Sequence, residues 1–293
     1  MLWSGLKSFF RRYCLCFDSI RLLDWMHRKN IQLFFFFFMR YRVSPLILED
    51  VYKHGFDDEE MGRLFALGTS SLKIGKIFKT TGLMRTRMAD GMLLKRAEEK
   101  KKPSLMEIGV SDGSSSLGLF DHFEMFERIV LTDRFSRFYV RKHFFWKLIL
   151  DAEKRMYGLK ILCFFIFLSP KKVKDSTECV PIEVINPILR KKYGIQAITR
   201  FDMFEDVLDE PVDLIKCSNI LNKAYFSDRE ICLAVAKLCQ SLREGGHILI
   251  SQNNKQYKDG EAGFILRKEG DDVYLEEAFN NHDCLNLFKT YIG

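Results

Sequence analysis

The sequence predicts an α/β fold whose main domain is a doubly wound, mostly parallel sheet over residues 103–293. Two observations lead to this prediction. Residues 105–133 read as strand, glycine-bearing turn, helix and strand, because apolar runs stand on either side of a small polar segment and a stretch with helical spacing. From residue 212 onward, strand-like and helix-like segments alternate again. We expect two additions to this core: a helical N-terminal extension over residues 1–102 and a β-hairpin inserted at about residues 134–181.

The composition is that of an ordinary globular protein, with 47% hydrophobic and 29% charged residues in a chain of 293. Its charge is uneven, because residues 1–42 hold eight lysines and arginines but two acids, and so carry +6 of the formal net charge of +7. The nearly neutral remainder argues against a nucleic-acid-binding domain, whose basic residues would spread over the folded surface. The eight cysteines form no C-x-x-C pair and have no histidine at zinc spacing, so we expect free thiols in a reducing cytoplasm and no metal site.

The N-terminal extension begins with an expected amphipathic helix over residues 2–26, in which apolar side chains recur every three or four positions. A basic helix with a broad aromatic face has two interpretations: it lies in a membrane interface, or it packs on the protein's own core or on a partner. Residues 34–38 are five consecutive phenylalanines, which must be buried, cover a partner or contact lipid. Residues 1–42 are therefore the expected contact with a membrane or a protein partner.

The rest of the extension reads as mostly helical. Residues 46–66 have a helical pattern, and the acids of residues 57–60 stand near a helix start, where negative charge suits the helix dipole. Residues 69–81 are polar and contain glycine, which predicts a turn or a short basic helix. Residues 84–102 form the last predicted helix, and Pro103 ends it.

The inserted hairpin is predicted from two aromatic-rich strands, residues 144–150 and 159–168, which the polar segment DAEKRMYG separates. Neither apolar run is long enough to span a membrane. A polar loop over residues 169–181 follows. Residues 182–193 fit no single element, because Pro187 interrupts their apolar pattern.

The C-terminal part is predicted from the same local patterns. Asp228 is the expected N-cap of a helix, and Glu244-Gly245-Gly246 is its expected C-terminal stop. Residues 284–291 are a short closing strand or helix. The strands expected around them are residues 195–201, 212–217 and 247–251, with a hairpin at residues 264–267 and 273–276.

Polar residues follow these strands at the points where the strands end. Ligands of open α/β sheets bind at that edge, which the carboxyl ends of the parallel strands form. The spacing E-x-G-x-S-x-G differs from the G-x-G-x-x-G of dinucleotide sites, which disfavours a pyrophosphate ligand and hence a dinucleotide oxidoreductase. The residues expected at this edge are Glu107, Gly109, Asp112, Gly113, Asp133, Asp202, Ser218 and Asn219.

Residues 105–276 resemble the class I S-adenosylmethionine-dependent methyltransferases. Four segments carry the resemblance in the family's order: LMEIGVSDG, IVLTD, FDMF and LREGGHILI. Ser111 stands where the family has the middle glycine of its G-x-G-x-G turn. The resemblance implies a Rossmann-like methyltransferase fold and S-adenosylmethionine as the cofactor.

The resemblance also implies a role for each matching residue. Glu107 would lie near the methionine amino group, and Gly109 and Gly113 would lie against methionine and ribose. Asp133 would contact the ribose hydroxyls, Asp202 with Met203 would lie at adenine, and Asn219 would face the sulfonium side. Ser111, within the same turn, is also an expected cofactor-binding residue.

The predicted function is methyl transfer from S-adenosylmethionine to a small-molecule, lipid or glycan acceptor, with no nucleic acid as partner. No convincing general base follows the fourth strand, and the weak candidates are Asn222 and Tyr225. Two alternatives stay open: a non-catalytic scaffold, and a protein carboxyl methyltransferase. The second rests on residues 217–226, which are similar to the fourth-strand region of chemotaxis-receptor methyltransferases. We expect the protein in the cytoplasm, either free or peripheral at a membrane.

Overall fold

The structure is a computed structural model that describes residues 13–29, 41–74, 77–78, 81–82, 85–162, 164–173 and 178–289. The five phenylalanines of residues 34–38 and the first part of the helix predicted over residues 2–26 lie outside the described residues. The chain divides into two compact units. Unit 1 comprises Met1–Gly82 and Phe135–Ile198, and unit 2 comprises Leu83–Arg134 and Thr199–Gly293.

Unit 2 is built on a seven-stranded sheet with the order β12-β6-β5-β13-β14-β15-β16. The first five of these strands are parallel, and β15 and β16 add an antiparallel meander. Numbered along the chain, the parallel strands stand in the order 3-2-1-4-5, which is that of a doubly wound sheet. The strands are β5 (Ser104–Ile108), β6 (Arg128–Asp133), β12 (Thr199–Arg200), β13 (Val212–Ser218), β14 (Leu242–Asn253), β15 (Glu261–Glu269) and β16 (Asp272–Phe279). The predicted fold class is confirmed.

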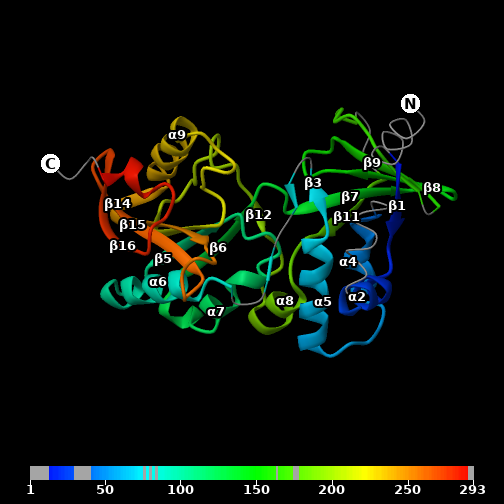
Figure 1. The fold of residues 1–293 in the computed structure, drawn as a ribbon, viewed down its shortest axis with the longest axis horizontal. Coiled ribbons are helices and arrows are strands. Elements are labelled where there is room, and N and C mark those ends of the chain that lie inside the picture. The colour runs from blue at the N-terminus through cyan, green and yellow to red at the C-terminus, as the bar shows by residue number, and fades with distance from the viewer. Residues whose placement is uncertain are drawn as a thin grey trace. The chain divides into compact units, whose positions relative to one another are not determined.

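Helices cover both faces of this sheet (Figure 1). On one face, Ala89 and Leu93 of α6 (Arg87–Glu99) pack with Leu119 of α7 (Leu117–Phe120). On the other face, α9 (Asp228–Cys239) buries an apolar stripe that includes Ile231 and Leu238. The remaining turns are 3-10 helices η1 (Ser114–Ser116), η2 (Phe123–Met125) and η3 (Leu285–Leu287). Side chains along β5 and β13 therefore alternate between an α6 face and an α9 face.

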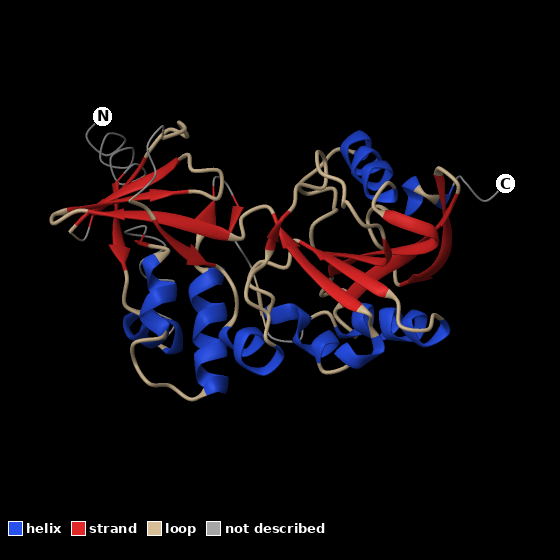
Figure 2. Ribbon diagram, turned by 180° about the vertical axis from the view of Figure 1, so that it is seen from behind, coloured by secondary structure: helices blue, strands red, loops and turns tan. Residues whose placement is uncertain are grey.

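Unit 1 has its own seven-stranded sheet, in the order β11-β7-β8-β9-β10-β1-β2. Figure 2 shows its helices gathered on one face of the sheet, where they share an apolar core with it. The strands are β1 (Tyr13–Phe17), β2 (Tyr41–Val43), β7 (Arg137–Lys142), β8 (Trp146–Leu150), β9 (Met156–Ile161), β10 (Phe164–Phe167) and β11 (Val180–Glu183). The other elements are α2 (Ile20–Arg28), α4 (Leu46–Val51), α5 (Asp58–Ser70), α8 (Pro187–Tyr193) and a short hairpin of β3 (Lys73–Ile74) and β4 (Ile77–Phe78).

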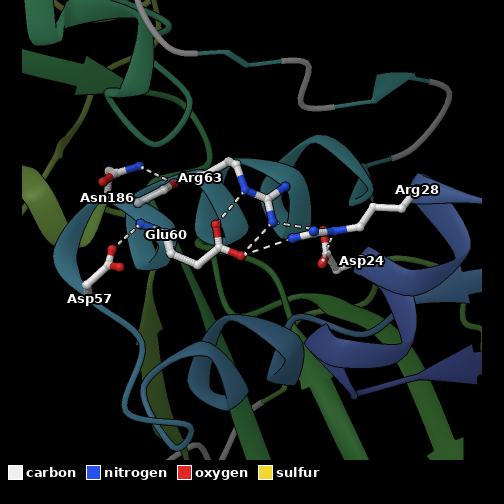
Figure 3. A network of polar contacts seen from close by, with 7 residues as sticks. Asp24, Arg28, Asp57, Glu60, Arg63 and Asn186 are labelled. Atoms are coloured by element: carbon white, nitrogen blue, oxygen red, sulfur yellow. Dashed lines mark hydrogen bonds and ion pairs between the residues drawn. The ribbon is translucent and has the colours of Figure 1, made fainter.

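A polar network joins α2 to α5 within unit 1 (Figure 3). Arg63 donates to Asp24 Oδ1 over 2.9 Å and to Glu60 Oε2 over 2.8 Å. Arg28 donates to Glu60 Oε1 over 3.2 Å. The hydrogen bond from Arg63 lowers the pKa of Glu60 below its usual value. The side chain of Asp57 caps α5, as the acids at residues 57–60 predict, by accepting from the Glu60 N–H over 2.8 Å.

The prediction of a single helix over residues 2–26 is partly wrong. Tyr13–Phe17 form strand β1, and helix α2 begins only at Ile20, after Ser19 has accepted a hydrogen bond from the Leu22 N–H as its N-cap. The strand forms because β10 and β2 flank it on either side and pair with its backbone groups. Those partners lie far away in the sequence, so local periodicity does not reveal them.

The inserted segment is larger than the predicted hairpin. Strands β8 and β9 pair as expected. The strand predicted over residues 159–168 is wrong as a single element, because a turn at Leu162 splits it into β9 and β10. Strands β7 and β10 flank the hairpin, β11 pairs with β7 at the edge, and β1 and β2 complete the same sheet. The insertion and the N-terminal segment thus form one unit, whereas residues 83–102 group with the doubly wound sheet.

Several local boundaries in unit 2 also differ from the predictions. Ser227, not Asp228, is the N-cap of α9, in a reciprocal capping box with Glu230. The Gly245-Gly246 pair lies inside β14 instead of ending the helix, because the register between β13 and β14 shifts there and Gly245 takes a φ of +66°. The strand predicted over residues 195–201 is reduced to Thr199–Arg200. None of the described helices is long and apolar enough to cross a membrane.

Candidate functional site

The turn after β5 has an unusual backbone. Gly109, Ser111 and Gly113 have φ values of +64°, +61° and +82°, so every second residue is left-handed. At Gly109 a Cβ would also stand 2.2 Å from Ile220 Cδ1. Glycine adopts this backbone freely, whereas serine pays a steric cost. The alternation turns the chain sharply between β5 and η1, at the point where the strand order of the sheet reverses between β5 and β13.

Asp133 at the end of β6 closes this turn. Its Oδ2 accepts a hydrogen bond from the Ser111 N–H over 2.8 Å, and the carboxyl group is buried. The Ser111 hydroxyl is buried without a hydrogen-bond partner among the described residues. The sequence predicted that the first turn and the second strand end meet at one edge, and the structure brings Ser111 and Asp133 together there.

Glu107 lies in a buried ionic cluster that the sequence analysis missed. Lys216 stands opposite it on β13 and is fully buried. The Lys216 Nζ lies 2.7 Å from Glu107 Oε1 and 2.7 Å from Asp90 Oδ1 of α6, and it donates to Thr86 Oγ1 over 3.2 Å. Glu107 Oε2 is buried and has no hydrogen-bond partner among the described residues. The available signal was a lysine inside the strand run of residues 212–217, whose other charged residue, Asp213, stands near its start.

The cluster holds two carboxylates against one ammonium group. Burial raises the pKa of Asp90 to about 6, the charge of Lys216 opposes this rise, and the charge of Glu107 adds to it. Burial by itself lowers the pKa of Lys216, but the charges of Glu107 and Asp90 outweigh it and raise that pKa above its usual value. Two carboxyl groups thus share one ammonium group, an arrangement that leaves room for the charge of a second cationic group.

Asp202 and Met203 lie where the third strand ends, but Asp202 is engaged locally. Its Oδ1 accepts from the Phe204 N–H over 3.1 Å, and its Oδ2 lies 3.3 Å from Arg134 Nε. Met203 is buried in the apolar cluster on the α9 face. Each carboxylate oxygen of Asp202 therefore has one partner and keeps a second lone pair for a further donor, such as an adenine amino group.

Asn219 follows β13 with a left-handed φ of +62°. Its N–H donates to the Ser251 carbonyl and its Oδ1 accepts from the Asn253 N–H, both over 2.7 Å. Beside it, the Ser218 and Ser251 hydroxyls lie 2.8 Å apart. Asn219 thus joins the ends of β13 and β14 at the carboxyl edge of the sheet.

The two candidates for a catalytic base have ordinary surroundings. Asn222 Oδ1 accepts from the Ala224 N–H over 3.1 Å, which makes it the cap of a local turn. Tyr225 is exposed, and its ring meets Phe226 edge-on with a centroid distance of 6.5 Å. Neither side chain is held by a carboxylate or histidine in the contacts that the structure describes for them.

The residues of this edge fit S-adenosylmethionine in part. The left-handed turn, the buried oxygen of Glu107 and the carboxylate of Asp133 suit a cationic amino-acid end joined to a ribose. The carboxylate of Asp202 already accepts from the Phe204 N–H and lies beside Arg134, so the adenine amino group would be an additional donor to it.

No family model and no curated protein matches this chain. Among solved structures, it is similar to the N-methyltransferase NodS from Bradyrhizobium japonicum WM9 in complex with S-adenosyl-l-homocysteine, at 14% identity and a TM-score of 0.34, over 59% of this chain and 65% of that one. It is also similar to CalS10, an amino pentose methyltransferase from Micromonospora echinaspora, at 12% identity and a TM-score of 0.32, over 63% and 62% of the two chains.

A third similar structure is phosphoethanolamine N-methyltransferase 1 from Haemonchus contortus, at 15% identity and a TM-score of 0.33, over 59% of this chain and 26% of that one. The chain therefore spans less than two thirds of each of these three proteins. Similarity at this level does not assign an activity, and the doubly wound fold of unit 2 rests on its own strand order.

Proposed function

We propose that unit 2 binds S-adenosylmethionine and that the protein is a methyltransferase for a small-molecule, lipid or glycan acceptor. One observation carries the proposal: the left-handed turn of Gly109, Ser111 and Gly113, closed by Asp133 at the switch point of the sheet. The order of the four family-like sequence segments supports the same ligand.

In this proposal each residue of the edge has a binding role. The buried Oε2 of Glu107 receives the methionine ammonium group, while Lys216 holds Oε1. The left-handed turn lets the backbone approach the ligand closely. Asp133 accepts the ribose hydroxyls, Asp202 with Met203 lines the adenine, and Asn219 faces the sulfonium side.

The bound cofactor supplies a methyl group that its sulfonium already activates. The chain's own task is then to hold the acceptor in line with that group, and positioning of this kind contributes up to about 7–11 kcal/mol to a reaction barrier. An acceptor that is unprotonated at neutral pH needs no general base. The ordinary surroundings of Asn222 and Tyr225 agree with such an acceptor.

Calorimetry with S-adenosylhomocysteine tests cofactor binding. Asp133→Asn keeps an oxygen for the Ser111 N–H but removes the charge, so we expect binding about tenfold to a hundredfold weaker than for wild type. Asp133→Ala also removes the support of the turn and should bind more weakly still. Asp271→Asn, an exposed acid in the same unit, is the control and should bind like wild type. Absence of binding by the wild-type protein would overturn the proposal.

Methyl transfer is tested separately with labelled S-adenosylmethionine and extract of cells that lack the protein. Label in a small-molecule, lipid or glycan fraction supports the proposal. Label in protein that is lost under mild base indicates carboxyl methylation instead. Tight cofactor binding with no label in any fraction indicates a non-catalytic scaffold.

A further inference from the structure

Two tight turns of unit 1 lie at the same end of its sheet. The first, between β7 and β8, has Phe144 and Phe145 at its corners and is closed by a hydrogen bond from the His143 N–H to the Trp146 carbonyl over 2.8 Å. The second, between β9 and β10, has Leu162 at a corner. The register pairs Trp146 with Ile161, so both turns project from one end of the sheet.

These corners carry large apolar side chains where turns normally carry Gly, Asn, Asp or Ser. Phe144 is 89% exposed, Phe145 65% and Leu162 73%. Leu162 also has a φ of +50°, a left-handed conformation that costs a leucine free energy. Packing among the described residues does not explain these side chains, because they face solvent. We call Phe144, Phe145 and Leu162 the apolar tip.

The strands behind the apolar tip carry four bases, which pair with three acids from other segments and so leave a small excess of positive charge. Residues 138–150 and 156–168 contain four basic residues and no acid. Lys147 and Lys160 face each other across β8 and β9, and both pair with Asp18. Two more bases, Arg141 and Lys142, pair with acids from other segments, Glu178 and Glu49. The side chains of Lys142 and Lys147 stay 50% and 37% exposed.

We propose that the apolar tip of unit 1 inserts into the interface of an anionic membrane. Aromatic and large aliphatic side chains at the end of a rigid hairpin enter the headgroup and acyl boundary, and the bases behind them meet anionic headgroups. Two narrow turns backed by the partly exposed Lys142 and Lys147 match a lipid surface, whereas a stable protein interface would bury a broader area, roughly 800 Å² per partner. This docking surface belongs to unit 1 and is independent of the cofactor proposal.

Vesicle flotation of the full-length protein tests the proposal. The tip variant is Phe144→Ser with Phe145→Ser and Leu162→Asn, which places turn-compatible residues at exposed corners and so preserves the fold. Phe123→Ser with Leu233→Ser is the matched control, because these side chains are 57% and 56% exposed in unit 2. Wild type and control should float with phosphatidylserine-containing vesicles. The tip variant should bind about a hundredfold more weakly, since three apolar side chains lose partial burial.

A second measurement locates the insertion. Phe144→Trp should show a blue-shifted emission with these vesicles and quenching by lipids brominated on their acyl chains. Binding should weaken with salt and on vesicles of phosphatidylcholine alone. Equal flotation of the tip variant and wild type, or no flotation of wild type, would refute the proposal. Concentration-dependent self-association that the tip variant abolishes, without vesicle binding, would assign the surface to a second copy of the chain.

Discussion

Replacement of Lys216 by methionine tests the buried cluster beneath the cofactor edge. Lys216 is fully buried, and its ammonium group lies 2.7 Å from both Glu107 Oε1 and Asp90 Oδ1. Lys216→Met keeps most of the side-chain volume but leaves two carboxyl groups in the interior without their cation. Removing one partner from a buried ion pair costs about 3–5 kcal/mol, so we expect the free energy of unfolding to fall by that amount at neutral pH.

The pH dependence of this loss gives a sharper test. Asp90 already has its pKa raised to about 6, first by burial and despite Lys216. Without the lysine, the folded protein binds protons on its buried carboxyl groups. The free-energy cost of binding these protons becomes smaller as the pH falls. The variant should therefore lose most stability above pH 6 and recover part of it toward pH 5. Urea unfolding followed by circular dichroism measures the free energy of unfolding above pH 6 and near pH 5.

Two further variants separate charge from packing at this site. Adding Glu107→Gln and Asp90→Asn to Lys216→Met removes both unpaired charges and should restore part of the lost stability. Lys223→Met, at an exposed lysine that pairs with Asp228, should leave the unfolding transition unchanged. If Lys216→Met stayed within about 0.5 kcal/mol of wild type, as surface substitutions do, the buried ionic cluster would be refuted.

Three more predictions concern unit 2. Ser111→Gly should raise the free energy of unfolding by about 1 kcal/mol, because it relieves a left-handed serine and removes a buried hydroxyl without a partner; a loss of stability in urea unfolding would contradict this. Ser227→Ala removes the N-cap of α9 and should lower the free energy of unfolding by about 1 kcal/mol, whereas Ser227→Asp should lower it little. Equal unfolding midpoints for Ser227→Ala and wild type would argue against the cap. Because the pKa of Asp90 is raised, the folded state binds a proton on this carboxyl group more tightly than the unfolded state does. This carboxyl group should therefore lower the free energy of unfolding of the wild type by about 2–3 kcal/mol as the pH rises from about 4 to 6. Asp90→Asn lacks this slope, so its stability relative to wild type should rise over the same range, and a constant difference would show that Asp90 does not titrate there.

Local patterns predicted much of unit 2 correctly. The apolar runs at residues 105–110, 128–132 and 212–217 correspond to β5, β6 and β13, and the stripe with Ile231 and Leu238 corresponds to the buried face of α9. These predictions succeed because a strand or helix that is buried on one side repeats its apolar residues at a fixed period. The meeting of the turn after β5 with Asp133 at the end of β6 followed from the same reasoning, since parallel strands end together.

The predictions failed where an element depends on partners far away in the chain. Tyr13–Phe17 have an amphipathic pattern that also fits a helix, and only pairing with β10 and β2 makes them a strand. Lys216 resembles a charge interrupting an apolar strand, and only the approach of α6 places Asp90 beside it. The pairing of β1 with β10 and the contact of Asp90 with Lys216 each join segments that the sequence separates by more than a hundred residues.

The sequence by itself determined the doubly wound class of unit 2 and the polar residues that end its strands, because periodicity, turn residues and strand ends are local properties. Only the tertiary structure decided that the N-terminal segment and the insertion share one sheet, and that Glu107 is held by a buried lysine. It also decided that Phe144, Phe145 and Leu162 face solvent at the end of that sheet. The physical reason is that strand pairing, charge burial and exposure depend on which distant segments meet, and the period of a sequence does not specify its partners.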